Sequence, residues 1–233
     1  MFKTRDLTTS ALLGAALLGV AGSASAAPVN IVTRFRNTGV EIVSPTGPGT
    51  TALAAGTADP HYSLTTVPFG APSIPLTMTP HPVWKSDAEG GVSPFLSRWI
   101  GPFDNGTTDA PAGLYVYHYT FDLTGYDAST VAVTGRWSSD NGATMKLNGT
   151  LTGNGTVEEA FRVWTPFSLP LGSSFVSGVN TLDFLVDNVG STASPSGLRV
   201  EYLTATAADP VPEPFTMALA GGALAMAVRR RRK

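Results

Sequence analysis

Two Asp-Asn pairs carry the most suggestive polar chemistry in the chain. Asp140 and Asn141 follow one predicted strand, and Asp187 and Asn188 end another. Carboxylate and amide oxygens in loops are the ligands that Ca²⁺ prefers, so these four residues would form a calcium site if the two strands are neighbours. The same residue types also stabilise turns by bonding to nearby backbone, which is the main alternative. The spacing is not that of an EF-hand, because no D-x-D-x-D-G run is present.

The tryptophans suggest a second kind of site, because an indole ring can stack on a sugar or fill a core. Trp137 alternates in phase with Val131 and Val133, so we expect it in the core. Trp84 and Trp99 lie in irregular sequence. We therefore expect these two residues to be the candidates for an exposed, ligand-binding platform.

The residues that catalysis needs are scattered or absent. His61, His81 and His118 are the only histidines, and their separations match no zinc motif. Glu158 and Glu159 are adjacent, so in a strand they would point to opposite faces and make a poor glycosidase pair. The chain has no Gly-x-Ser-x-Gly segment and no cysteine. We predict that the protein is not an enzyme and has no catalytic residue.

The N-terminal residues 1–26 are typical of a secretory signal peptide. Lys3 and Arg5 form a positive start, and residues 11–20 are apolar. Ala24 and Ala26 supply the small side chains that a signal peptidase requires, so the mature chain is expected to begin at Ala27. Export to an oxidising compartment without cysteine leaves stability to a core or to bound ions.

The C-terminal residues 210–233 have three parts. An apolar stretch, residues 215–228, separates a proline-rich tetrad from a basic end; the tetrad is Val211, Pro212, Glu213 and Pro214, and the basic end is Arg229, Arg230, Arg231, Arg232 and Lys233. As a helix the apolar stretch would cover roughly 21 Å, less than the ~30 Å of a hydrocarbon core. It is expected to form a short transmembrane helix with the basic residues on the cytoplasmic side.

This tail resembles the PEP-CTERM sorting signal of Gram-negative bacteria. The resemblance implies recognition by exosortase, a membrane transpeptidase thought to cut near the Pro-Glu-Pro unit, and transient anchoring before the protein reaches the cell surface or the extracellular space. A permanent C-terminal membrane anchor is the alternative.

The remaining residues 27–209 are long enough for one domain with a sizeable core. Of the 15 Lys and Arg residues eight lie in this range, and of the 17 Asp and Glu residues 15 do, so its net charge is −7. An acidic domain is not expected to bind nucleic acid or anionic lipid.

Short alternating segments separated by turn residues predict an all-β fold, a jelly-roll β-sandwich. Asn148 and Gly149 predict a hairpin turn. The predicted strands are 31–36, 40–43, 114–123, 130–137, 143–147, 181–186 and 198–203. Residues 27–83 are expected to be rich in loops, because eight prolines lie between 45 and 82, and residues 84–204 are expected to form the core jelly roll.

The order of several short motifs in residues 84–204 resembles the galactose-binding-like jelly roll found in PEP-CTERM proteins, whose members bind sugars or act as spacers. The motifs are Trp99-Ile100, Thr120-Phe121-Asp122-Leu123, Gly135-Arg136-Trp137-Ser138-Ser139-Asp140-Asn141-Gly142, Leu147-Asn148-Gly149, Trp164-Thr165-Pro166-Phe167, Gly178-Val179-Asn180-Thr181-Leu182 and Asp187-Asn188.

Three functions follow from these observations. The first is an exported, exosortase-sorted, non-catalytic surface or extracellular-matrix protein that binds polysaccharide. The second is a structural spacer without a ligand. The third is a secreted hydrolase whose site would be assembled from the loops of residues 45–109.

Overall fold

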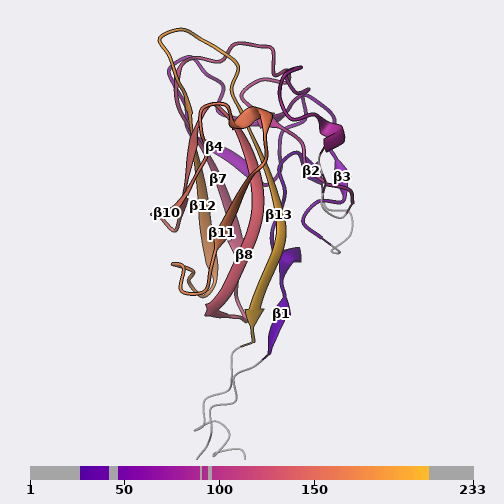
Figure 1. Ribbon diagram of the computed structural model, residues 1–233, viewed down its shortest axis with the longest axis vertical. Coiled ribbons are helices and arrows are strands. Elements are labelled where there is room, and N and C mark those ends of the chain that lie inside the picture. The colour runs from indigo at the N-terminus through magenta and orange to yellow at the C-terminus, as the bar shows by residue number, and fades with distance from the viewer. Residues whose placement is uncertain (1–26, 42–46, 90, 94–95, 210–233) are drawn as a thin grey trace, which may run out of the picture. The chain divides into compact units, whose positions relative to one another are not determined.

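In the computed structural model, which describes residues 27–41, 47–89, 91–93 and 96–209, two antiparallel sheets pack face to face (Figure 1). The first sheet has the order β11 (Thr165–Leu169), β8 (Asp127–Asp140), β13 (Gly197–Ala208), β6 (Ile100–Gly101) and β5 (Leu76–Thr77), and β1 (Pro28–Asn30) also pairs with β13. The second sheet has the order β10 (Thr150–Gly155), β9 (Ala143–Leu147), β12 (Val179–Asn188), β7 (Gly113–Asp122) and β4 (Tyr62–Thr66). The predicted β-sandwich is confirmed.

The remaining elements are short. Strands β2 (Val40–Glu41) and β3 (Thr51–Ala52) form a separate pair. The helical elements of the described residues are three 3₁₀ turns, η1 (Val32–Arg34), η2 (Asp87–Glu89) and η3 (Ala160–Arg162). No helix in these residues is long and apolar enough to cross a membrane. The predicted signal peptide and C-terminal helix lie outside the described residues.

The core lies between the sheets and follows the predicted alternation. One face of each central strand is buried because side chains two residues apart in a strand share a face. The inward residues are Tyr115, Tyr117, Tyr119 and Phe121 of β7, Leu182, Phe184 and Val186 of β12, Val131, Val133 and Trp137 of β8, and Leu198, Val200 and Tyr202 of β13. The expectation that Trp137 belongs to the core is thus confirmed.

The predicted hairpin turn joins β9 to β10. Asn148 and Gly149 both have positive φ, at 49° and 80°, as a type I′ turn requires. The Asn148 side chain also connects strands, since its Nδ2 donates to Asn180 Oδ1 (2.9 Å) and its Oδ1 accepts from Thr181 N (2.8 Å).

The predicted strand at residues 31–36 is wrong. Strand β1 ends at Asn30, and the 3₁₀ turn η1 follows. Asn30 Oδ1 accepts a hydrogen bond from Val32 N (2.9 Å), which starts the turn. The turn buries Ile31, Val32 and Phe35 together, a spacing that a strand could not bury on one face. Of the strand predicted at 40–43, residues 40–41 form β2 and the rest lies outside the described residues.

The segment expected to be rich in loops also contributes to both sheets. Strand β4 forms one edge of the second sheet and buries Tyr62 and Leu64. Strand β5 forms an edge of the first sheet. The prolines at 60, 68 and 75 lie just outside these two strands, consistent with the exclusion of proline from paired strand interiors.

A buried ionic network attaches Ser86, Gly91 and Ser97 to the outer face of the first sheet. Arg199 and Glu201 of β13 point away from the core, yet both are fully buried. Glu201 accepts hydrogen bonds from Gly91 N (2.8 Å), Ser97 Oγ (2.6 Å) and Arg136 Nε (2.6 Å). Arg199 donates to Ser97 Oγ (2.8 Å), and also to Ser86 O (3.0 Å). Burial lowers the pKa of Arg199 to about 10, so it stays charged at neutral pH.

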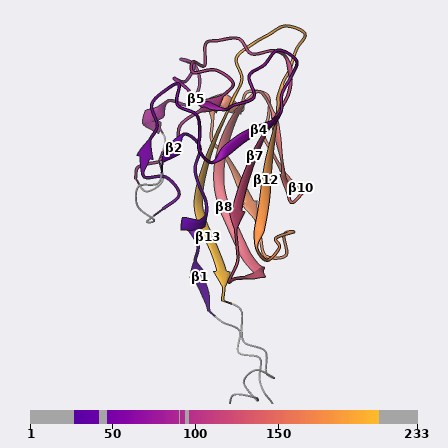
Figure 2. The ribbon, with the colours of Figure 1, turned by 180° about the vertical axis from the view of Figure 1, so that it is seen from behind.

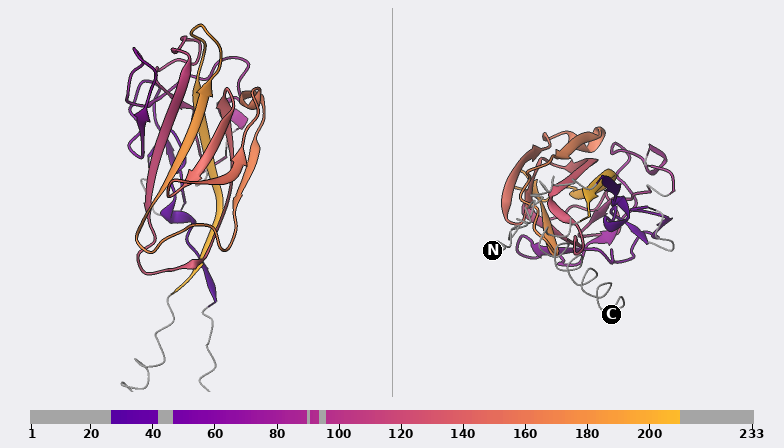
Figure 3. Two further views of the ribbon diagram at one scale, coloured as in Figure 1. Left: turned by 90° about the vertical axis from the view of Figure 1, so that its left-hand side faces the viewer. Right: turned by 90° about the horizontal axis from the view of Figure 1, so that it is seen from below.

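The first and last strands define one end of the sandwich. Pro28 pairs with Ala208, and Ala208 pairs with Asp127 at the start of β8. At the opposite end Asp140 pairs with Gly197, and Asn188 pairs with Gly113. We name these ends the proximal pole and the distal pole. Figures 1 and 2 show β1 beside the end of β13 at the lower, proximal pole, and Figure 3 shows the same strands from two further sides.

Two core tyrosines of β7 allow a matched test of this packing. Tyr115 OH donates to Pro111 O (2.9 Å), whereas the buried Tyr117 OH has no hydrogen-bond partner in the described part of the chain. A buried hydroxyl without a partner costs about 1–3 kcal/mol. We therefore expect Tyr117→Phe to raise the free energy of unfolding by about 1 kcal/mol and Tyr115→Phe to lower it by a similar amount, as measured by urea titration. A loss of stability in both variants would contradict this assignment.

Candidate functional site

Trp84 and Trp99 do not form an exposed platform. Their exposed fractions are 5% and 0%, and their ring centroids lie 4.5 Å apart. Together with Met78 they form a second, smaller core against the first sheet. Trp99 Nε1 donates to Lys85 O (2.8 Å), and Trp84 Nε1 donates to Asp140 Oδ2 (2.9 Å). The prediction of an exposed site at these residues is therefore wrong, because the indoles find partners far away in the sequence.

Asp140 joins this small core to the distal pole. Its carboxylate accepts the Trp84 hydrogen bond, and its main-chain oxygen accepts one from Ser196 Oγ (2.9 Å). Burial raises the pKa of Asp140 to about 6 and outweighs the opposite effect of the Trp84 hydrogen bond. Asp140 thus connects the end of β8 to Trp84 and to Ser196.

Asn188 and Asn141 hold the loops of the same pole. Asn188 Nδ2 donates to Ala110 O (2.9 Å), Pro111 O (3.2 Å) and Ser194 O (3.1 Å), and its Oδ1 accepts from Ser194 Oγ (2.9 Å). Asn141 Oδ1 accepts from Val189 N (3.1 Å). These carboxamides therefore bind the protein's own backbone, the alternative role considered for them.

The four predicted calcium ligands lie at one pole but do not form one ligand set. Asp187 is exposed on the outer face of β12, whereas Asn188, the next residue, is buried on the opposite face. The Asp140 carboxylate is directed to Trp84. Among the described residues no group of three or more His, Cys, Asp or Glu side chains could hold a metal ion. The side chains of Asp140, Asn141, Asp187 and Asn188 are therefore not gathered into the calcium site that the sequence predicts.

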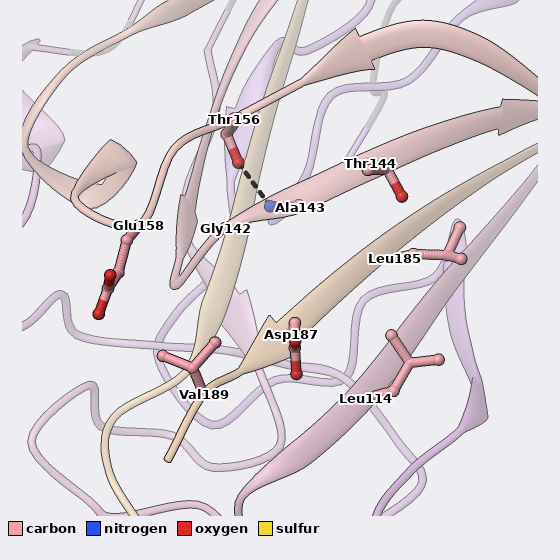
Figure 4. Close-up of a pocket in the computed structure, with 9 residues that line it drawn as sticks. All are labelled: Leu114, Gly142, Ala143, Thr144, Thr156, Glu158, Leu185, Asp187 and Val189. Atoms are coloured by element: carbon pink, nitrogen blue, oxygen red, sulfur yellow. Dashed lines mark hydrogen bonds between the residues drawn. The ribbon is translucent and has the colours of Figure 1, made fainter.

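Asp187 instead lines a groove of about 530 Å³ on the outer face of the second sheet, at the distal pole. Figure 4 shows Asp187 near the centre, with Glu158 and Val189 on one side and Leu114 and Leu185 on the other. The residues that line it are Leu114, Gly142, Ala143, Thr144, Thr156, Glu158, Leu185, Asp187 and Val189. Sequence reasoning proposed only Asp187 as a ligand-binding residue, because the groove arises from three strands and three loops.

Strand register and two hydrogen bonds shape the groove. Asp187 lies opposite Leu114, and Leu185 lies opposite Thr144. Thr156 Oγ1 accepts from Ala143 N (2.7 Å), which fixes the segment that carries Glu158. Asp187 N donates to Gly142 O (2.9 Å) and joins β12 to the turn that precedes β9. Strand pairing and these two hydrogen bonds thus fix the segments that form the walls of the groove.

The chemistry of the groove suits a ligand rich in hydroxyl groups. The carboxylates of Asp187 and Glu158 can accept hydrogen bonds, and the hydroxyl of Thr144 can donate or accept them, whereas Thr156 Oγ1 is already bonded to Ala143 N (2.7 Å) and Ser139 Oγ (2.6 Å). The aliphatic side chains suit C–H groups. Among the described residues no serine, histidine or cysteine lines it.

A polar row crosses the middle of the same sheet face. His118 Nδ1 lies 2.6 Å from Asp183 Oδ1, and Ser63 is the cross-strand neighbour of His118 on the other side. The order Ser, His, Asp is that of a hydrolase triad. However, no hydrogen bond joins Ser63 to His118 in the described residues, and the row lies on an open sheet outside the groove.

No protein-family model matches the chain, and no curated protein matches it. It is similar to solved structures that include the CBM35 from Paenibacillus barcinonensis (16% identity, 63% of this chain and 94% of that one, TM-score 0.33). Another is a carbohydrate-binding module CBM36 in complex with calcium and xylotriose (14%, 48% and 82%, TM-score 0.28). A third is an exo-β-1,3-galactanase from Phanerochaete chrysosporium (11%, 67% and 31%, TM-score 0.30). The architecture of this chain is given by its own strand pairing.

The buried Asp140 carboxyl makes stability depend on pH. Its pKa in the folded state, about 6, is above the ordinary value of 3.8, so folding favours the protonated carboxyl. The contribution of this protonated form to the free energy of unfolding is fully present below pH ~4 and is lost as the pH rises through 6. Asp140→Asn keeps an acceptor for Trp84 without the charge. We expect its free energy of unfolding to exceed that of the wild type by about 2–3 kcal/mol at pH 7.5 and to equal it near pH 4.

Urea titrations between pH 4 and pH 8 measure this difference, and Asp187→Asn on the exposed face is the matched control. A difference that does not change with pH would contradict the burial of a charged Asp140.

Proposed function

We propose that the chain is an exported, non-catalytic protein of the cell surface or extracellular matrix, whose galactose-binding-like jelly roll binds polysaccharide in the distal-pole groove. The observation that carries this proposal is the pairing of β1 with the end of β13. Because of it the chain enters and leaves the sandwich at the proximal pole, and the groove lies at the opposite end. A domain held at its termini therefore has its groove directed away from the point of attachment.

The two terminal signals support the cellular part of the proposal. The sequence of residues 1–26 fits a signal peptidase substrate, and the Val211-Pro212-Glu213-Pro214 tetrad with its basic end fits an exosortase-type transpeptidase. The protein would cross the inner membrane, be anchored transiently by the C-terminal helix, and then reach the surface or the exterior.

The composition of the groove supports a neutral polysaccharide as ligand. Two carboxylates and the hydroxyl of Thr144 lie beside three aliphatic side chains in one groove, and sugars present hydroxyl and C–H groups side by side. The net charge of −7 between residues 27 and 209 opposes strongly anionic polymers.

The polysaccharide proposal is tested with Asp187→Ala and Glu158→Ala. We expect each variant to weaken binding to a soluble neutral polysaccharide about tenfold, a typical effect of removing a charged hydrogen-bond acceptor. Affinity electrophoresis in galactan, xylan and glucan gels measures the change. Glu159→Ala is the matched control, because Glu159 is highly exposed and its carboxylate lies 3.8 Å from Arg162.

A ligand that binds only the folded state must also raise its melting temperature. If no polysaccharide shifts the melting temperature or the mobility of the wild-type protein, the ligand-free spacer is the better description. The use of Asp140, Asn141 and Asn188 within the fold favours that second function.

Processing is tested by the intact mass of the protein isolated from its own cells. We expect a chain that begins at Ala27, ends near Pro214 and is found outside the inner membrane. A membrane-bound chain that retains Arg229 to Lys233 would contradict exosortase sorting and indicate a permanent anchor.

A further inference from the structure

The connection between β4 and β5 presents one fully exposed aromatic ring. Phe69 lies at the tip of the turn formed by residues 68–71, in which Ala71 N donates to Pro68 O (3.1 Å). Gly70, the third residue, has φ 85°, as a type II turn requires. Phe69 therefore occupies the outermost corner of a regular, hydrogen-bonded turn.

Both ends of this turn are fixed to the sandwich. Val67 and Ala71 pack against the main core. Pro68 lies on Gly113 so closely that a Cβ at that glycine would meet Pro68 Cγ at 3.1 Å. The Phe69 ring is thus held out by a supported turn, and solvent exposure of a whole phenylalanine side chain is unfavourable without a partner.

This turn adjoins the groove. Strand β4 runs toward the distal pole, since Tyr62 pairs with Tyr119 and Thr66 pairs with Val116. Gly113, which contacts Pro68, is followed directly by Leu114 of the groove. With consecutive Cα atoms 3.8 Å apart, Phe69 and Leu114 lie within roughly 15 Å of each other.

We propose that Phe69 is the stacking residue of the distal-pole site, and that it holds one sugar ring of the polysaccharide chain that occupies the groove. This inference rests on the proposed function. One face of a pyranose ring carries C–H groups with partial positive charge, which suit the negative face of an aromatic ring. The groove itself is lined by no aromatic residue in the described part of the chain, so Phe69 supplies what the groove lacks. The ligand is therefore a chain of several sugars and not a single sugar.

Binding as a function of oligosaccharide length tests this role. Neutral galactan, xylan and glucan oligosaccharides of one to six sugars are titrated calorimetrically against the wild type, Phe69→Ala and Phe69→Trp. We expect Phe69→Ala to lose about tenfold in affinity for the long oligosaccharides, with an unchanged affinity for the shortest one that binds. Phe69→Trp is expected to retain or improve the affinity. The matched control is Val179→Ala, which removes an exposed apolar side chain from the proximal pole.

Each other outcome overturns the assignment in a distinguishable way. If Asp187→Ala weakens binding but Phe69→Ala does not at any length, the groove binds sugar and Phe69 has no part in it. If the wild type binds none of the series, both this inference and the proposed function are overturned. If Phe69→Ala instead abolishes a dimer in sedimentation while glycan affinity is unchanged, Phe69 serves contact between two copies of the chain.

Discussion

The burial of two charged residues, Arg199 and Glu201, is the constraint that determines how Ser86, Gly91 and Ser97 pack on the outer face of the first sheet. A charge removed from water must be paired and hydrogen-bonded, and Glu201 meets this demand with Arg136, Ser97 and a backbone N–H. Gly91 and Ser97 lie outside the strands, so these hydrogen bonds to Glu201, and not strand pairing, attach them to the first sheet. Residues 197–202 of β13 are consequently buried on both faces, although the outer face carries the charged residues Arg199 and Glu201.

The constraint extends to the distal pole through Trp84. The indole meets Asp140 at the end of β8. Asn188 then joins the loops at residues 110–111 and 194. The polar side chains of this pole thus divide into two classes. Some form hydrogen bonds within the fold, and others, such as that of Asp187, are exposed at the surface.

Local alternation was enough to predict most of the core, because Tyr115, Tyr117 and Tyr119 repeat with the period of a strand. The Asn148-Gly149 turn was equally predictable, since few dipeptides accept two positive φ angles. The burial of Trp84 was not, because its partner lies 56 residues away. The groove was not predictable either, since it depends on how Leu114, Thr144 and Asp187 come into register across three strands.

The pairing of the first strand, β1, with the end of the last strand, β13, has a mechanical consequence. A polymer held at the distal pole and an attachment at residue 209 would pull on the domain along its strands. In that direction β13 is loaded in shear against β8, and the backbone hydrogen bonds between Gly197–Ala208 and Asp127–Asp140 carry the force together. A pull between residues 27 and 209 would instead peel apart the three residue pairs of β1 one at a time. The fold would therefore resist tension between the proposed attachment and the proposed ligand, and would yield more readily when residues 27 and 209 are drawn apart.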